Sequence, residues 1–109
     1  MTFLAIDSQK NLFTIQKSQL QFEQSLVVNR AAIIARDMGN MQAAKSPDDT
    51  TDISDDPQYV ALQREDDYLN TRKDSLDSQI ALLDSAISSM KTLVQNNIKS
   101  SCTLQLLGG

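Results

Sequence analysis

Apolar side chains recur every seven residues along the first half of the chain, and this repeat limits the possible folds more than any other feature. The repeat consists of Ile6, Phe13, Leu20, Val27, Ile34 and Met41. A seven-residue spacing keeps one apolar stripe of a helix turned toward a partner helix in a left-handed supercoil. Further apolar residues are expected to widen this stripe, namely Leu12, Ile15, Phe22, Leu26 and Ile33. We therefore predict a helix from about Ser8 to Ala44.

The end of this first helix depends on Gly39. Glycine is common just after the last turn of a helix, so Gly39 and Asn40 could end it early. A glycine inside a helix costs roughly 1 kcal/mol relative to alanine, and the following residues "MQAAK" could tolerate that cost. The sequence leaves both outcomes open.

The second half of the chain carries the same seven-residue repeat. Its members are Leu62, Leu69, Leu76, Leu83 and Met90. The start of this helix is well marked, because the carboxylate of Asp56 can accept hydrogen bonds from backbone N–H groups of the first turn. Pro57 suits the first helical position, where no N–H donor is needed. We predict a helix from Pro57 to about Ser100, followed by a short apolar tail over residues 101–109.

The segment between the repeats, Ser46 to Pro57, reads "SPDDTTDISDDP" and holds five aspartates. A calcium loop would place Gly at its sixth position and Glu at its twelfth. A frame that starts at Asp48 has Ile53 sixth and Tyr59 twelfth, so the pattern does not fit. We interpret residues 45–56 as a solvated acidic turn whose aspartates act as turn and cap residues. An acidic docking surface for a partner is the alternative.

Two long helices joined by a polar turn predict an all-α fold, a long antiparallel two-helix hairpin that resembles a coiled coil. The scarcity of turn formers agrees with this, since the chain of 109 residues has only three Gly and two Pro. A chain of this length is expected to form a single domain, residues 1–109. Because one helix covers only a stripe of its neighbour, we expect oligomerisation to complete the fold.

The apolar surface is expected to exceed what one partner helix can cover at the end of the hairpin far from the turn. Both chain termini are apolar there, since they read "TFLAI" and "TLQLLGG". We predict a distal assembly face formed by Phe3, Leu4, Phe22, Ile80, Ile87, Leu93, Val94, Ile98, Leu104, Leu106 and Leu107. Large exposed apolar patches mark sites of association.

Several classes of chemistry lack the residues they need. The chain has no His and one Cys, Cys102, so no His-based catalytic group and no internal disulfide are expected. We predict no enzyme activity, no metal and no cofactor. The net charge of −4 is due to residues 47–67, which contain eight acidic residues and one Arg. The sequence has no basic patch, so nucleic-acid binding is not expected.

The sequence contains no run of 18 apolar residues, so it predicts no membrane span. The apolar start "MTFLAID" lacks the basic residues of a cleaved signal peptide. The protein is therefore expected either in the cytoplasm or outside the cell after export without a cleaved signal.

The second half of the chain resembles the needle subunits of type III secretion systems. The matching elements are Pro47, Asp56-Pro57, Tyr59, Leu62 and Gln63 around the turn and "VQNNIK", Val94 to Lys99, near the end. The turn is longer than the tight turn of that family, and the first helix carries no motif of the family. The resemblance implies a small helical hairpin that is exported without a cleaved signal and stacks into a hollow filament. It also implies that Leu83, Ile87, Met90 and Val94 are packing positions.

These features lead to two functional hypotheses. The first is a structural subunit that self-assembles into a secreted helical filament or needle-like tube, through the seven-residue repeats and the distal face. The second is a coiled-coil adaptor or chaperone-like module that offers its apolar end to a helix of another protein. The expected partners are accordingly further copies of the chain or a helical partner protein.

Overall fold

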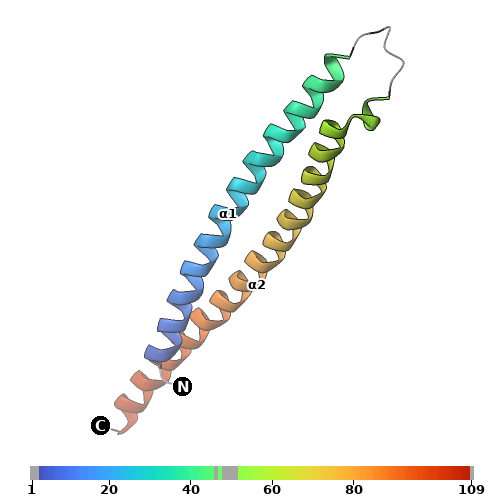
Figure 1. Ribbon diagram of the computed structural model, residues 1–109. Coiled ribbons are helices and arrows are strands. Elements are labelled where there is room, and N and C mark those ends of the chain that lie inside the picture. The colour runs from blue at the N-terminus through green and yellow to red at the C-terminus, as the bar shows by residue number, and fades with distance from the viewer. Residues whose placement is uncertain (1–2, 46, 48–51, 109) are drawn as a thin grey trace. The chain divides into compact units, whose positions relative to one another are not determined.

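The computed structural model describes residues 3–45, 47 and 52–108, and it gives the burial of side chains for residues 4–45, 47 and 52–100. Within these residues the chain is all-α, as the repeats predict. Helix α1 spans Phe3–Ala43, a short 3-10 helix η1 spans Ile53–Asp55, and helix α2 spans Pro57–Gly108 (Figure 1). The two long helices form a helical hairpin.

Helix α1 passes through Gly39 without a break and ends at Ala43. No described glycine has a positive φ, so Gly39 does not take the left-handed conformation that ends many helices. The last turn closes when the Ala44 N–H donates to the Asn40 carbonyl at 2.9 Å and the Lys45 N–H donates to the Gln42 carbonyl at 3.3 Å. The helix begins at Phe3, earlier than the predicted start at Ser8, because the residues between them contain no Gly or Pro.

Helix α2 starts at the predicted place. The Asp56 carboxylate accepts a hydrogen bond from the Gln58 N–H at 2.8 Å, and the Asp56 carbonyl accepts the first helical bond from the Val60 N–H at 2.9 Å. Asp56 is therefore the N-cap, and Pro57 occupies the first helical position.

The predicted end of this helix near Ser100 is wrong, because α2 continues to Gly108. The tail predicted for residues 101–109 is therefore helical up to Gly108. Residues 101–107 contain no Gly or Pro, and the first residue that favours a helix end is Gly108 itself.

The chain divides into two compact units, each of which contains a segment of both helices. The turn unit comprises residues 22–77, and the terminal unit comprises residues 1–21 and 78–109. The helices of the turn unit run antiparallel. Arg30 pairs with Glu65, and Gln42, further along α1, pairs with the earlier residue Tyr59 of α2.

Apart from Tyr59, the buried core residues are members of the two seven-residue repeats. In the turn unit the buried side chains are Val27, Ile34, Tyr59, Leu69 and Leu76, and Ile34 and Leu76 are fully enclosed. In the terminal unit Ile6 is buried. The remaining repeat positions are half-buried, namely Phe13, Leu20, Met41, Leu62, Leu83 and Met90. The repeat thus marks the side of each helix that has a neighbour.

The expectation that further apolar residues of α1 widen this stripe is wrong. Leu12, Ile15, Phe22, Leu26 and Ile33 are all exposed. Each residue of a helix turns by about 100°, so Phe22 lies about 200° from Leu20 and points away from the neighbouring helix. Leu26 and Ile33 each directly precede a buried residue and lie about 100° from it.

The enclosed core position predicts a large effect of truncation. Leu76→Ala should lower the free energy of unfolding by about 2–5 kcal/mol, because it removes buried methyl groups and leaves a cavity. The matched control is Leu82→Ala, which truncates a leucine that is 72% exposed and should change stability by less than about 0.5 kcal/mol. Denaturant unfolding followed by circular dichroism in dilute protein measures both. Equal losses would show that Leu76 is not part of the core.

Gly39 gives a second prediction. An added Cβ at Gly39 would meet no atom within 4 Å. Gly39→Ala should therefore stabilise the protein by about 0.5–1 kcal/mol through the higher helix propensity of alanine. The same unfolding experiment tests this, and a loss of stability would indicate that residue 39 is contacted in the folded protein.

Candidate functional site

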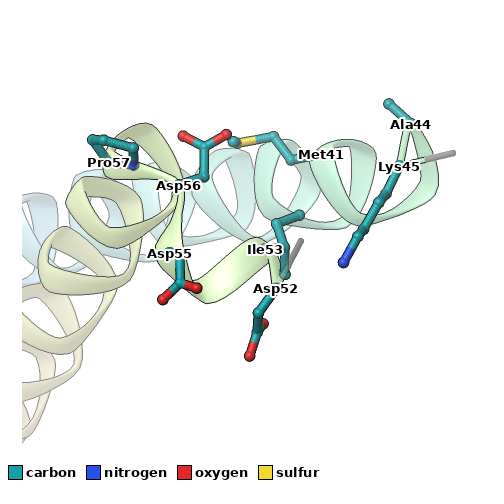
Figure 2. A pocket seen from close by; sticks show the side chains of 8 residues that line it. All are labelled: Met41, Ala44, Lys45, Asp52, Ile53, Asp55, Asp56 and Pro57. Carbon is teal, nitrogen blue, oxygen red and sulfur yellow. The ribbon is translucent and has the colours of Figure 1, made fainter. Parts of the chain in front are cut away.

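An open cavity of about 560 Å³ lies beside the turn. It is lined by Met41, Ala44, Lys45, Asp52, Ile53, Asp55, Asp56 and Pro57 (Figure 2). In Figure 2 the carboxylates of Asp55 and Asp56 point to different sides of the chain, so they do not converge on one point. Among the described residues no group of three His, Cys, Asp or Glu side chains is placed to hold a metal ion.

Two acidic residues of the turn, Asp52 and Asp56, bind the local backbone. The Asp52 carboxylate caps η1 by accepting a hydrogen bond from the Ser54 N–H at 3.0 Å. Hydrogen bonds from the backbone and side chain of Ser54 lower the pKa of Asp52, and the charge of Lys45 acts in the same direction. Asp56 caps α2 in the same manner. Asp48 and Asp49 lie outside the described residues.

Polar pairs connect the edges of the two helices in the turn unit. Arg30 binds Glu65 with two bonds, from Nε to Oε1 at 2.7 Å and from Nη2 to Oε2 at 3.1 Å. This pair raises the pKa of Arg30 and lowers the pKa of Glu65, in each case mainly through the hydrogen bonds between them. Arg72 Nε donates to Glu23 Oε1 at 2.7 Å.

Two further polar pairs lie in the turn unit. Gln24 donates to the Asp77 carboxylate, and Gln42 Nε2 donates to the hydroxyl of the buried Tyr59 at 2.7 Å. All these pairs join α1 to α2, so they fix which residues of the two antiparallel segments lie opposite each other.

The outward face of α1 in the turn unit carries exposed apolar side chains. We define it as Phe22, Ser25, Leu26, Asn29, Ala32 and Ile33, which are all exposed. Its apolar members Phe22, Leu26 and Ile33 are 67%, 52% and 40% exposed. None of these six described side chains is charged, although a helix face in contact with water is usually rich in charge.

The charged residues Glu23 and Arg30 lie at the edge of the outward face. Glu23 and Arg30 are seven residues apart and therefore lie on the same side of the helix. Both reach toward α2, where they bind Arg72 and Glu65. Helix α1 thus has one apolar stripe against α2 and, from Phe22 to Ile33, a second face toward solvent that holds no charged residue. The exposed Arg36 follows on the same side of the helix one turn further on.

The terminal unit has exposed apolar side chains of its own. On α1 these are Leu4, Leu12 and Ile15, and on α2 they are Leu82, Leu93 and Ile98. An open groove of about 430 Å³ lies between the helices and is lined by Gln16, Gln19, Leu20, Gln79, Leu82 and Leu83. Beside it, Lys17 Nζ lies 2.5 Å from the Asp84 carboxylate. Beyond this pairing α2 continues past the first turn of α1 (Figure 1).

The residues predicted for the distal assembly face have different environments. Leu4, Phe22, Leu93 and Ile98 are exposed, whereas Ile80, Ile87 and Val94 are half-buried. The side chains of Phe3, Leu104, Leu106 and Leu107 lie outside the part of the chain for which side chains are described. Phe22 belongs to the turn unit, so exposed apolar surface is not confined to the end far from the turn.

The sequence analysis does not identify the outward face, because it predicts that Phe22, Leu26 and Ile33 belong to the packed stripe. The available signal was the position of the charges. Plotted with a seven-residue period, Glu23 and Arg30 fall beside the repeat that includes Val27, and the opposite side of the helix holds no charge between Phe22 and Ile33.

Comparisons of the chain with models of protein families, with curated proteins and with solved structures find no match. In the described residues neither helix contains a segment long and apolar enough to cross a membrane. The functional proposal therefore depends on the surfaces themselves.

The Arg30–Glu65 pair predicts a dependence of stability on pH. The pKa of Glu65 is lowered in the folded state, so its carboxylate stabilises the fold at pH values above the pKa of the unfolded state. This contribution is lost as the pH falls through the lower folded-state value. Glu65→Gln removes it, so the variant should lose less stability than the wild type between about pH 6 and pH 3.

Asp67→Asn is the matched control, because Asp67 is an exposed carboxylate of the same helix two residues further on. Unfolding curves at a series of pH values compare the three proteins. An identical decline for wild type and Glu65→Gln would show that the ion pair does not contribute in solution.

Proposed function

We propose that this protein is a structural subunit that self-assembles through helix α1. The observation that carries the proposal is the outward face of α1 in the turn unit, which exposes Phe22, Leu26 and Ile33 and holds no charged residue. A helix with apolar residues on two opposite sides needs a neighbour on both sides to bury them. Within one chain, α2 covers only one of these sides.

The energetics favour a partner for this face. Full burial of a Phe, Leu or Ile side chain stabilises by roughly 1.5–3 kcal/mol, and three such residues lie on the outward face. Single exposed apolar residues are ordinary on protein surfaces. An uncharged row of them along one side of a helix is typical of helix–helix interfaces instead.

A filament would need a second contact surface on each subunit. The terminal unit offers exposed apolar side chains on both helices, including Leu12, Ile15 and Leu82. A subunit with two separate contact surfaces can add further copies without closing into a dimer. This supports a filament, in line with the resemblance to type III secretion needle subunits. That resemblance, and with it export without a cleaved signal, stays a prediction.

A second candidate is the adaptor or chaperone-like module, which the groove of the terminal unit favours. Leu20, Leu82 and Leu83 line this groove together with glutamine side chains. A helix of another protein could lay its apolar side chains on the leucines and receive hydrogen bonds from the glutamine amides. In that case the purified chain would stay monomeric until its partner is added.

Two aromatic residues of the turn unit provide a matched test. Phe22 on the outward face of α1 and Tyr68 on α2 are 67% and 66% exposed. Phe22→Asp should weaken self-association at least about tenfold, because it places a charge inside the interface, whereas Tyr68→Asp should leave association within about twofold. Light scattering over a series of protein concentrations measures association, and negative-stain images of the same samples reveal any filaments.

A wild-type chain that remains monomeric at all concentrations would contradict self-assembly and favour the adaptor. Equal weakening by both substitutions would show that α1 is not the specific contact surface.

A further inference from the structure

We propose that the outward face of α1 in the turn unit packs against the same face of a second copy, antiparallel, about a two-fold axis between Val27 and Val28. This inference rests on the proposed self-assembly and adds the partner, the direction and the register. It is carried by the order of apolar, polar and charged residues along α1, all of which are described in the structure.

The apolar residues of the outward face match in this arrangement. In an antiparallel pair of helices, early residues of one chain lie opposite late residues of the other. With the axis between Val27 and Val28, Phe22 lies opposite Ile33 of the second copy, and Leu26 lies opposite Asn29 of the second copy. Two-fold symmetry repeats both contacts, so the bulky residues Phe22 and Ile33 meet at each end of the interface.

The charges at the edge of the face select this register. In antiparallel pairs, an edge row of one helix faces the same row of the other helix in reverse order. Glu23 therefore lies opposite Arg30 of the second copy, and Arg30 lies opposite Glu23 of the second copy. These opposite charges attract each other.

Other arrangements lose this charge match. A shift of the antiparallel register by one seven-residue repeat puts Glu23 opposite Glu23 of the second copy, which is repulsive. A parallel pair would place the row of Glu23 and Arg30 against the other edge, which holds the uncharged Ser25 and Ala32. Only the proposed register forms two symmetric ion pairs.

The existing contacts place these side chains suitably. Glu23 and Arg30 are bound to Arg72 and Glu65, yet their side chains remain 40% and 49% exposed. Each can therefore contact a second group of opposite charge without leaving its present partner. The result is a row of alternating charge along one edge of the interface, from Glu65 and Arg30 of one copy to Glu23 and Arg72 of the second copy. Networks of this kind contribute more than isolated surface pairs.

Asn29 supports the specificity of the pairing. It lies in the middle of the outward face and is exposed in the single chain. A polar residue at one position of an otherwise apolar interface lowers stability but disfavours other registers. Opposite Leu26, and close to the two-fold axis, Asn29 can do this for both copies at once.

Charge reversal tests the register. Glu23→Lys and Arg30→Glu each place like charges opposite one another in the proposed dimer, and each also breaks an ion pair with α2. The double variant restores opposite charges between copies, but both pairs with α2 stay broken. We expect each single substitution to weaken dimerisation about tenfold and the double variant to return within about threefold of wild type.

Analytical ultracentrifugation gives the dimerisation constants, and circular dichroism confirms that each variant is helical. A double variant as weak as the singles, or weaker, would overturn the register, because it would show that these charges act only within the chain. A wild-type chain that does not associate would instead overturn the proposed function along with the register, so the two failures are distinguishable.

Chemical cross-linking gives an independent test in a Cys102→Ser background, which removes the only native thiol. Ser25 and Ala32 lie on the second edge of the face, and the proposed register puts Ser25 of one copy opposite Ala32 of the other. A short bifunctional thiol reagent should therefore link the Ser25→Cys chain to the Ala32→Cys chain in a mixture, as detected by mass spectrometry. Neither variant should link efficiently to itself.

Self-links of the Ser25→Cys chain or of the Ala32→Cys chain would indicate a register shifted by one seven-residue repeat and would overturn the proposal. The same conclusion holds if the chains associate but no link forms in the mixture.

Discussion

One neighbouring helix can cover only one stripe of a long helix, and this limit governs the rest of the structure. The stripe that α2 covers on α1 is the seven-residue repeat, with Val27 and Ile34 buried in the turn unit. The apolar residues that lie off this stripe have no place in the core of a two-helix hairpin. Phe22, Leu26 and Ile33 are exposed for this reason, and their exposure is the basis of the proposed assembly.

The ion pairs between the helices act at two levels in this account. Within one chain, Arg30–Glu65 and Glu23–Arg72 fix which residues of the antiparallel segments lie opposite each other. They also hold Glu23 and Arg30 at the edge of the outward face, where both stay partly exposed. The same side chains that align the hairpin can therefore align a second copy, because opposite charges seven residues apart are complementary to their own reversed order.

The acidic turn has a simpler physical explanation than its composition suggests. Asp52 and Asp56 each accept a hydrogen bond from a backbone N–H two residues further on, so they start η1 and α2. The backbone thus orients these two carboxylates, which point in different directions in Figure 2. Negative charge near the start of a helix also interacts favourably with the helix dipole. The turn therefore determines where α2 begins.

The sequence by itself determined the all-α hairpin, the start of α2 at Pro57 and the residues of the packed stripe. These features depend on local or periodic information, such as a cap residue before a proline or an apolar residue at every seventh position. The sequence did not determine where α2 ends, since residues 101–107 are compatible with a tail as well as a helix. It also did not show that Phe22 and Leu26 lie outside the packed stripe. The rotation of about 100° per residue gives their angles around α1, but not the position of the neighbouring helix.

Only the tertiary structure decided that question, because the position of the neighbouring helix defines which apolar residues are inside. It also decided which charges pair, since residues as far apart as Glu23 and Arg72 meet only when the two helices are aligned.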